Sequence, residues 1–198
     1  MIVVYAGSFN PVTKAHEIIA KSVRNKLQAK ILFVPVSDLY NKPGLAKFNY
    51  RYEMLEMISE DYEDIAVSDI ENKLASKLSR QPKTYETLHE LKKDCDEEIG
   101  LLIGTDNFYD LPNWFRFEGL IQEFYMVVYP RKGMNNEFTN SELYQKYHDR
   151  FVIVDGIEEM DISASMVRDN IIKGSSNHDL LNEKIIAYID KYRQDIGY

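Results

Sequence analysis

The sequence predicts an α/β protein with a Rossmann-like, doubly wound, mostly parallel sheet and helices on both faces. Short apolar segments alternate with segments of helical periodicity along the whole chain. The apolar segments show no alternation of polar and apolar residues, which indicates strands buried on both faces. In such sheets ligands bind outside the carboxyl ends of the strands, near the point where strand order reverses. The residues that follow each strand are therefore the candidates for function.

The strands and helices are expected in alternation. The first strand is apolar and β-branched and ends in a Gly-Ser…Asn-Pro turn, and Ile18, Ile19, Val23 and Leu27 then recur at helical spacing. The expected strands are Ile2 to Tyr5, Ala29 to Val36, Ile65 to Ile70, Ile99 to Gly104, Tyr125 to Tyr129 and Phe151 to Val154. The expected helices are Thr13 to Leu27, Tyr50 to Ser59, Thr84 to Asp94, Trp114 to Phe124, Ser163 to Lys173 and Leu180 to Tyr192. Asp38 to Phe48, with Pro43 and Gly44, is expected as a mobile loop, and Lys132 to Asn140 as an irregular polar segment.

Length and composition are those of one globular unit. The 198 residues are 44% hydrophobic and 28% charged, so we expect a single domain over 1–198 with a small helical portion at about 162–198. The net charge of −8 and the lack of a Lys/Arg cluster argue against nucleic-acid binding. No apolar run reaches the length of a membrane span, no signal peptide is visible, and Cys95 is the only cysteine. A reducing cytoplasm is the expected location.

The strongest motif, GSFNPVTKAH, lies between the first strand and the first helix. Gly7 and Ser8 favour a tight turn with exposed backbone amides, at which the positive end of the following helix points. Thr13 and His16 are three residues apart and lie on one face of the helix start. Neither GxGxxG nor a P-loop is present. Taken alone, the motif is more typical of a Thr N-cap followed by a surface histidine.

A second motif, ISASMVR, opens a late helix. Ser163 or Ser165 is suited to cap the helix, and Arg168 lies on its first turns. Hydroxyls, free backbone amides and a guanidinium together form an anion site. Taken alone, the segment also fits an ordinary capped helix with a solvated arginine.

Together these two motifs resemble the nucleotidylyltransferase superfamily. Three further segments are similar to one branch, the nicotinate-nucleotide adenylyltransferases: Arg51-Tyr52-Glu53-Met54-Leu55, Thr84-Tyr85-Glu86-Thr87-Leu88, and Leu102-Ile103-Gly104-Thr105-Asp106 with Leu111-Pro112-Asn113-Trp114. The resemblance covers nearly the whole chain in the same order. It implies transfer of the adenylyl group of ATP to nicotinate mononucleotide, or to nicotinamide mononucleotide, with release of pyrophosphate.

The resemblance also implies roles for individual residues. His16, Thr13 and Arg168 are expected to be catalytic, with His16 on the reacting phosphates and Arg168, with Ser163, on the β- and γ-phosphates. The remaining residues expected to bind ATP are Gly7, Ser8, Phe9, Gly104, Asp106 and Ile162. Trp114 is expected to stack on the pyridine, although the only tryptophan of a small domain is often in the core. Thr84 is expected at the nicotinyl end, and Lys42 either reaches a phosphate or is a solvated loop lysine.

No general base is needed, because a phosphate already is a nucleophile, so catalysis reduces to positioning and charge neutralisation. Two polyanions must meet, so Mg²⁺ is expected, held mainly by substrate phosphates and water, with no metal site made by the protein. A homo-oligomer through the C-terminal helix is compatible with the sequence.

Three departures from the family pattern bear on these expectations. Ala15 replaces a glycine, Asn10 an aspartate, and Lys83 an aromatic residue. Lys83 favours an acid over an amide at the pyridine only weakly. The alternatives are pantetheine-phosphate adenylyltransferase and a non-catalytic nucleotide-binding module of the same fold.

Overall fold

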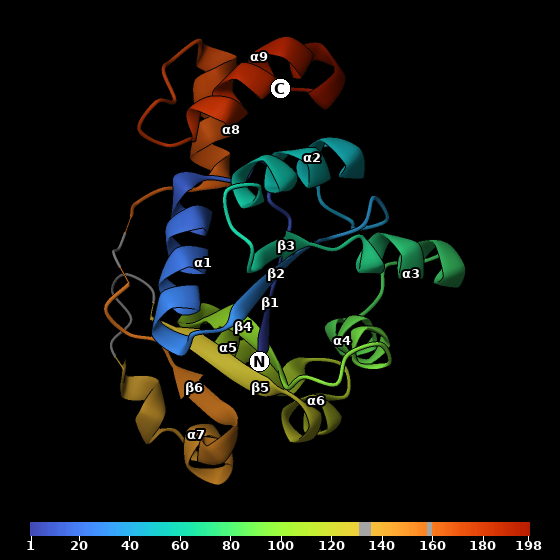
Figure 1. The fold of residues 1–198 in the computed structure, drawn as a ribbon, viewed down its shortest axis with the longest axis vertical. Coiled ribbons are helices and arrows are strands. Elements are labelled where there is room, and N and C mark those ends of the chain that lie inside the picture. The colour runs from blue at the N-terminus through green and yellow to red at the C-terminus, as the bar shows by residue number, and fades with distance from the viewer. Residues whose placement is uncertain (131–135, 158–159) are drawn as a thin grey trace.

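A computed structural model describes residues 1–130, 136–157 and 160–198, and contains one parallel sheet (Figure 1). The sheet has six strands in the order β3-β2-β1-β4-β5-β6. The strands are β1 Ile2–Gly7, β2 Lys30–Pro35, β3 Ile65–Val67, β4 Ile99–Gly104, β5 Tyr125–Tyr129 and β6 Phe151–Ile153. All five pairings are parallel. The predicted fold class is confirmed.

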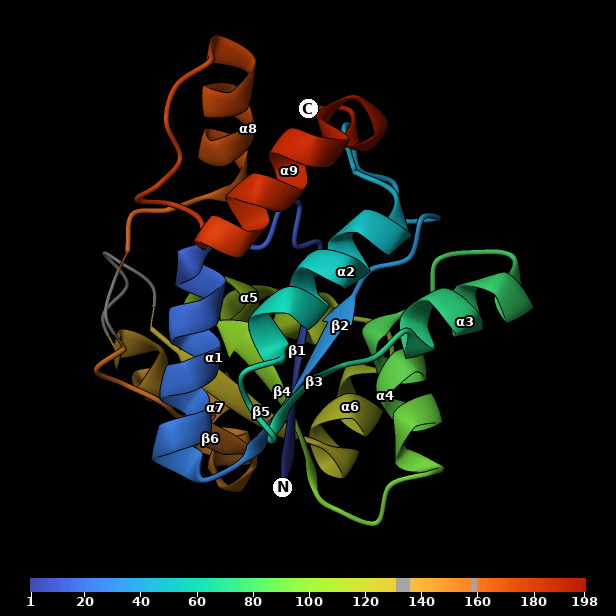
Figure 2. The same ribbon diagram turned by 45° about the horizontal axis from the view of Figure 1, so that its top comes forward.

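Helices cover both faces of the sheet. They are α1 Lys14–Leu27, α2 Phe48–Ser59, α3 Ile70–Leu78, α4 Thr84–Lys92, α5 Thr105–Asp110, α6 Phe117–Glu123, α7 Glu142–Tyr147, α8 Ala164–Lys173 and α9 Glu183–Ile196. Three short 3₁₀ turns are Leu111–Asn113, Asn136–Asn140 and His148–Arg150. Figure 2 shows α9 running alongside α2, with α8 beside it.

Two hydrophobic clusters lie on opposite faces of the sheet, because successive strand residues point to opposite sides. Val3 and Tyr5 of β1 belong to the cluster that α1, α2, α8 and α9 cover. Val4, between them, belongs to the cluster under α4, α5 and α6. This double burial explains the uniformly apolar strands.

Several predicted boundaries were wrong. The strand expected to reach Ile70 ends at Val67, and α3 begins at Ile70. The helix expected from Trp114 begins at Phe117, because Trp114 ends a 3₁₀ turn in an extended conformation. The sequence reading also missed α3, α5 and α7; α5 and α7 have only 6 residues each, too few to display a helical period. Part of the segment expected as irregular, residues 131–135, lies outside the described residues.

The strand order reverses between β1 and β4, which are neighbours in the centre of the sheet. Their carboxyl ends, at Gly7 and Gly104, open toward the same edge. This is the position at which open α/β sheets bind ligands. Among the described residues, no helix is long and apolar enough to span a membrane.

Candidate active site

The turn after β1 is built around buried groups. A Cβ at Gly7 would lie 3.1 Å from the Phe9 ring, so only glycine leaves the turn undistorted. Phe9, at a positive φ of 44°, is 1% exposed and packs edge-on against His16. The side chain of Phe9 therefore faces the core, and only its backbone is available to a nucleotide.

Asn10 connects this turn to distant segments through hydrogen bonds. It is fully buried; its amide donates to the Gly44 carbonyl at 2.7 Å, and its Oδ1 accepts from the Ala46 N–H at 3.1 Å. The Tyr198 hydroxyl donates to the same Oδ1 at 2.8 Å, and burial raises the pKa of this phenol. An aspartate could not donate to Gly44, so the asparagine is the residue that these contacts require.

His16 is oriented by the N-terminus of α1. Its Nδ1 lies 3.0 Å from the Thr13 backbone nitrogen and 2.8 Å from Thr13 Oγ1. Because a backbone N–H can only donate, Nδ1 accepts and the ring proton lies on Nε2. Thr13 is the N-cap of α1 and is 1% exposed, so its side chain supports His16 rather than reaching a ligand directly. Ala15, in the first turn of α1, is partly exposed, and its effect on the nucleotide stays a prediction.

Arg168 comes from the other end of the chain to the same turn. Its guanidinium donates to the Asn10 carbonyl at 2.6 Å and to Ser165 Oγ at 3.1 Å. Ser163 caps α8 by accepting the Met166 N–H at 3.1 Å, and Ile162 lies just before it. The two predicted anion-binding motifs are therefore in contact, and Arg168 is not simply a solvated side chain.

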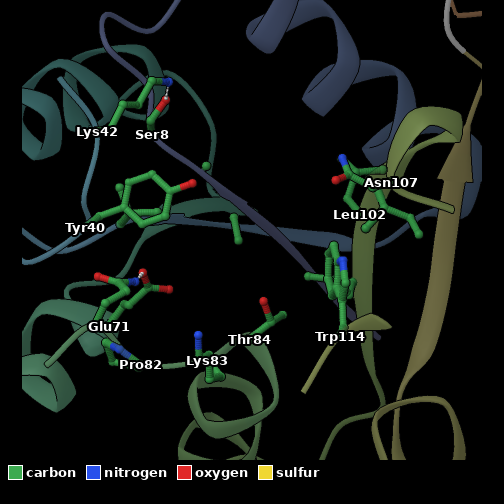
Figure 3. Close-up of a pocket in the computed structure, with 16 residues that line it drawn as sticks. Ser8, Tyr40, Lys42, Glu71, Pro82, Lys83, Thr84, Leu102, Asn107 and Trp114 are labelled. Atoms are coloured by element: carbon green, nitrogen blue, oxygen red, sulfur yellow. Dashed lines mark hydrogen bonds between the residues drawn. The ribbon is translucent and has the colours of Figure 1, made fainter. Parts of the chain in front are cut away.

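Lys42 adds a further positive charge beside the turn. Its ammonium donates to Ser8 Oγ at 2.9 Å (Figure 3). Partial desolvation, followed by the charges of Arg168 and Arg51, lowers the pKa of Lys42. Cations that repel one another in this way are stabilised when an anion binds between them.

Arg51 is a residue of this region to which the sequence reading gave no role. Its side chain is fully buried, and it donates to the carbonyls of Ala46, Ser8 and Val36 at 2.7, 3.1 and 2.8 Å. It thereby joins the segments after β1 and β2 to the loop before α2. The only signal in the sequence was its place in the Arg-Tyr-Glu-Met-Leu segment, which carries no information about these loop carbonyls.

A cavity of about 360 Å³ continues from Ser8 and Lys42 along the edge of the sheet (Figure 3). Thr84, at the start of α4, and Trp114 lie across it from Lys42. Trp114 packs only partly against the core, so its ring borders this cavity as the stacking role requires. The other lining residues are Ala6, Gly7, Val36, Tyr40, Glu71, Gln81, Pro82, Lys83, Leu101, Leu102, Ile103 and Asn107.

Asp110 accepts hydrogen bonds from the segment that carries Trp114. Its carboxylate accepts the indole N–H at 3.1 Å and the Asn113 amide at 3.0 Å. The indole plane is thus fixed by a residue that the sequence reading did not consider. It lies directly before the Leu-Pro-Asn-Trp segment, where only its position hinted at a function.

Glu71 is a buried carboxylate on the opposite wall. Its oxygens accept hydrogen bonds from the Gln81 amide and from the Thr87 hydroxyl. Burial raises the pKa of Glu71. These contacts make Glu71 a structural link between α3 and α4.

The end of β4 supplies the remaining predicted residues. Gly104 is buried as the N-cap of α5, and Asp106 is exposed in its first turn. The described residues contain no group of three or more His, Cys, Asp or Glu side chains suited to a metal ion. The expectation of a cation held by substrate phosphates and water stays a prediction.

Comparisons with known proteins cover nearly the whole chain. Residues 4–170 match the family model described as cytidylyltransferase-like. A protein of Acholeplasma laidlawii named "Probable nicotinate-nucleotide adenylyltransferase" is 31% identical over 96% of this chain and 94% of its own. A protein of the same name from Flavobacterium johnsoniae is 33% identical over 94% of both chains. The solved structure of Plasmodium falciparum nicotinic acid mononucleotide adenylyltransferase complexed with NaAD shares the fold, with a TM-score of 0.80 at 23% identity, over 97% of this chain and 95% of that one.

Proposed function

This chain belongs to the cytidylyltransferase-like family and, within it, to the nicotinate-nucleotide adenylyltransferases, and we propose that it transfers the adenylyl group of ATP to nicotinate mononucleotide. The products are the dinucleotide and pyrophosphate, so the reaction belongs to NAD biosynthesis. The observation that carries the proposal is the 2.6 Å hydrogen bond from Arg168 to Asn10, which joins the two anion-binding motifs across 158 residues.

The chemistry is an in-line displacement at phosphorus. A phosphate oxygen of the mononucleotide attacks the α-phosphorus of ATP, a new phosphoanhydride bond forms, and the bond to the β-phosphate breaks. The electron pair leaves with pyrophosphate. The protein's task is to bring the two anions together and to neutralise the charge that grows on the leaving group.

The side chains divide this task. His16 donates from Nε2 to a phosphate oxygen, since its Nδ1 is engaged by Thr13. Arg168 and Lys42 bind the outer phosphates from two sides, and the amides of the turn from Gly7 to Phe9 add uncharged donors. Mg²⁺, held mainly by the substrate phosphates and water, would supply further positive charge when bound.

The acceptor binds in the cavity between Lys42 and Trp114. The pyridine stacks on the indole, whose plane Asp110 fixes, and Thr84 lies at the nicotinyl end. The adenylate half lies toward Gly104 and Asp106 at the end of β4 and toward Ile162 before α8, while Ser163 joins Arg168 at the β- and γ-phosphates.

One assay tests this function. The protein is incubated with ATP and Mg²⁺ and, separately, nicotinate mononucleotide, nicotinamide mononucleotide or phosphopantetheine, and pyrophosphate and the adenylylated product are measured. We expect both products with nicotinate mononucleotide. Turnover with phosphopantetheine alone would move the chain to pantetheine-phosphate adenylyltransferase, and no turnover with any acceptor would leave a non-catalytic nucleotide-binding module.

A further inference from the structure

Lys83 lies at the entrance of the acceptor cavity. It is the N-cap residue of α4, directly before Thr84, and its side chain is exposed. It lines the main cavity and also an adjoining one that Thr84, Asn113, Trp114 and Phe115 border. Figure 3 shows its ammonium directed into the space between Thr84 and the wall that carries Glu71.

The lysines around α4 differ in their partners. Lys77 and Lys93 pair with Glu90, at 3.3 Å for Lys77, and Lys92 donates to the Glu97 carbonyl at 2.9 Å. The Lys83 ammonium makes no hydrogen bond or ion pair with any residue that the structure describes. It is therefore available to a ligand.

The carboxylates nearest to Lys83 are already engaged. Glu86 accepts the Lys83 backbone N–H at 2.8 Å, and its two oxygens bind Arg80 at 2.8 and 2.7 Å. The oxygens of Glu71 are taken by Gln81 and Thr87. The charge of Lys83 contributes to the lowered pKa of Glu86 but forms no ion pair with it. A negative charge that enters the cavity would therefore meet a cation without a bonded partner, reinforced by the N-terminus of α4.

A planar aromatic acid fits this arrangement. A ring stacked on Trp114 leaves a carboxylate on its edge facing the start of α4, where Lys83 and the first backbone amides of the helix lie. A carboxylate gains a charge-assisted hydrogen bond there. A carboxamide in the same place carries no charge and offers one acceptor oxygen instead of two, because its other terminus is an NH₂ donor.

We propose that Lys83 selects the acid form of the pyridine nucleotide over the amide form. The proposal rests on the proposed function, because it assumes that the pyridine of the acceptor lies against Trp114. In this chain a lysine side chain performs the selection at a position where the family pattern has an aromatic residue, so the charge itself becomes a determinant of specificity.

The test uses Trp114, the only tryptophan of the chain, as a probe. Its fluorescence is titrated with nicotinate mononucleotide and with nicotinamide mononucleotide, without ATP, for the wild type and Lys83→Met. Methionine keeps an unbranched side chain, one atom shorter, and removes the charge. Lys83→Arg keeps the charge, and Lys92→Met, at the far end of α4, is the control for the same change in net charge. The kcat/KM values for the two acceptors are measured in parallel.

We expect the wild type to favour the acid, and Lys83→Met to reduce the ratio of acid to amide affinity about tenfold, mainly by weakening acid binding. Lys83→Arg should keep most of the ratio, and Lys92→Met all of it. An unchanged ratio in Lys83→Met, while the acid is still bound and adenylylated, overturns the inference and leaves the proposed function standing. Wild-type protein that neither binds nor adenylylates either nucleotide overturns both.

Discussion

The contact between Thr13 and His16 shows how a short sequence motif is translated into a defined tautomer. The Thr13 backbone N–H, rather than its hydroxyl, forces Nδ1 of His16 to accept. Thr13 and His16 were both expected to be catalytic, and their geometry makes Thr13 the residue that orients His16, for which we propose the contact with the phosphates. This division of roles can be measured.

His16→Ala should lower kcat by about 10²–10³-fold, because a preorganised donor to the charge of the leaving group is lost. Thr13→Val keeps the backbone N–H that orients His16 and should stay within about tenfold of the wild type. Steady-state kinetics with ATP and nicotinate mononucleotide distinguish the two variants, and circular dichroism verifies that each is folded. Equal losses in both variants would mean that the hydroxyl, and not the backbone, controls His16.

Asp110 accepts hydrogen bonds from Trp114 and Asn113, so under the proposed function it is a positioning residue that acts through the wall of the acceptor cavity. Asp110→Ala should raise the KM for nicotinate mononucleotide about fivefold with a smaller change in kcat, since one hydrogen bond that orients the stacking ring is lost. The emission of Trp114 and its quenching by the nucleotide should change as well. Asp96→Ala, which removes an exposed carboxylate elsewhere, should alter neither. A pure loss of kcat in Asp110→Ala would speak for a direct chemical role.

At the scale of the element, the start of α4 depends on a charge network. Glu86 accepts the Lys83 N–H and binds Arg80 through both oxygens, and the Arg80 guanidinium lowers the pKa of Glu86 to about 2. This carboxyl is ionised above its unfolded pKa of about 4.3, so its contribution to stability is present at neutral pH. The contribution is lost as the pH falls toward the folded value.

Glu86→Gln should therefore lower the free energy of unfolding by about 0.5–1 kcal/mol at neutral pH, a modest figure because Arg80 is half exposed and water screens the pair. Near pH 2 the difference between wild type and variant should become much smaller, since this pH is at the folded-state pKa of Glu86, where about half of the carboxyls are protonated. Urea unfolding at the two pH values measures the difference in the free energy of unfolding between the wild type and Glu86→Gln. A difference of the same size at both pH values would show that the charge of Glu86 contributes nothing.

The elements also show what a sequence can predict. β4 and β5 were predicted to the residue, because strands buried on both faces are continuous apolar runs between polar turns. The Thr13 cap and the Ser163 cap could also be predicted, because Thr and Ser are preferred at the first position of a helix. Contacts between residues far apart in the chain were not readable: Arg51 on the carbonyls of Ser8, Val36 and Ala46 follows from tertiary packing that no local pattern encodes. Asp110, for its part, is one acidic residue among 32.

On the scale of the whole molecule, side chains connect the segments that border the site at the carboxyl ends of β1 and β4. Hydrogen bonds of four side chains make these connections: Asn10, Arg51, Arg168 and Tyr198. They join the segments after β1 and β2, the loop before α2, α8 and the C-terminal end. Arg168, for which we propose a role in phosphate binding, and this structural network share the residue Asn10, because Arg168 donates to the Asn10 carbonyl and the Asn10 side chain donates to the Gly44 carbonyl. Binding of ATP and rigidity of the crevice should therefore be coupled.

Substitution of Arg51 is the most direct test of this coupling. Arg51→Met fills a similar volume but leaves the three carbonyls without their donor in a buried site, so we expect a loss of about 3–5 kcal/mol in the free energy of unfolding. Arg24→Met, which removes a partly exposed arginine paired with Asp64 at 2.6 Å, should cost about 1 kcal/mol or less. Saturating ATP should stabilise the wild type more than Arg51→Met, because a loosened turn binds the phosphates less tightly. Urea unfolding with and without ATP measures all of these values. If Arg51→Met is as stable as Arg24→Met and ATP stabilises it as much as the wild type, the carbonyls after β1 and β2 do not depend on the Arg51 guanidinium.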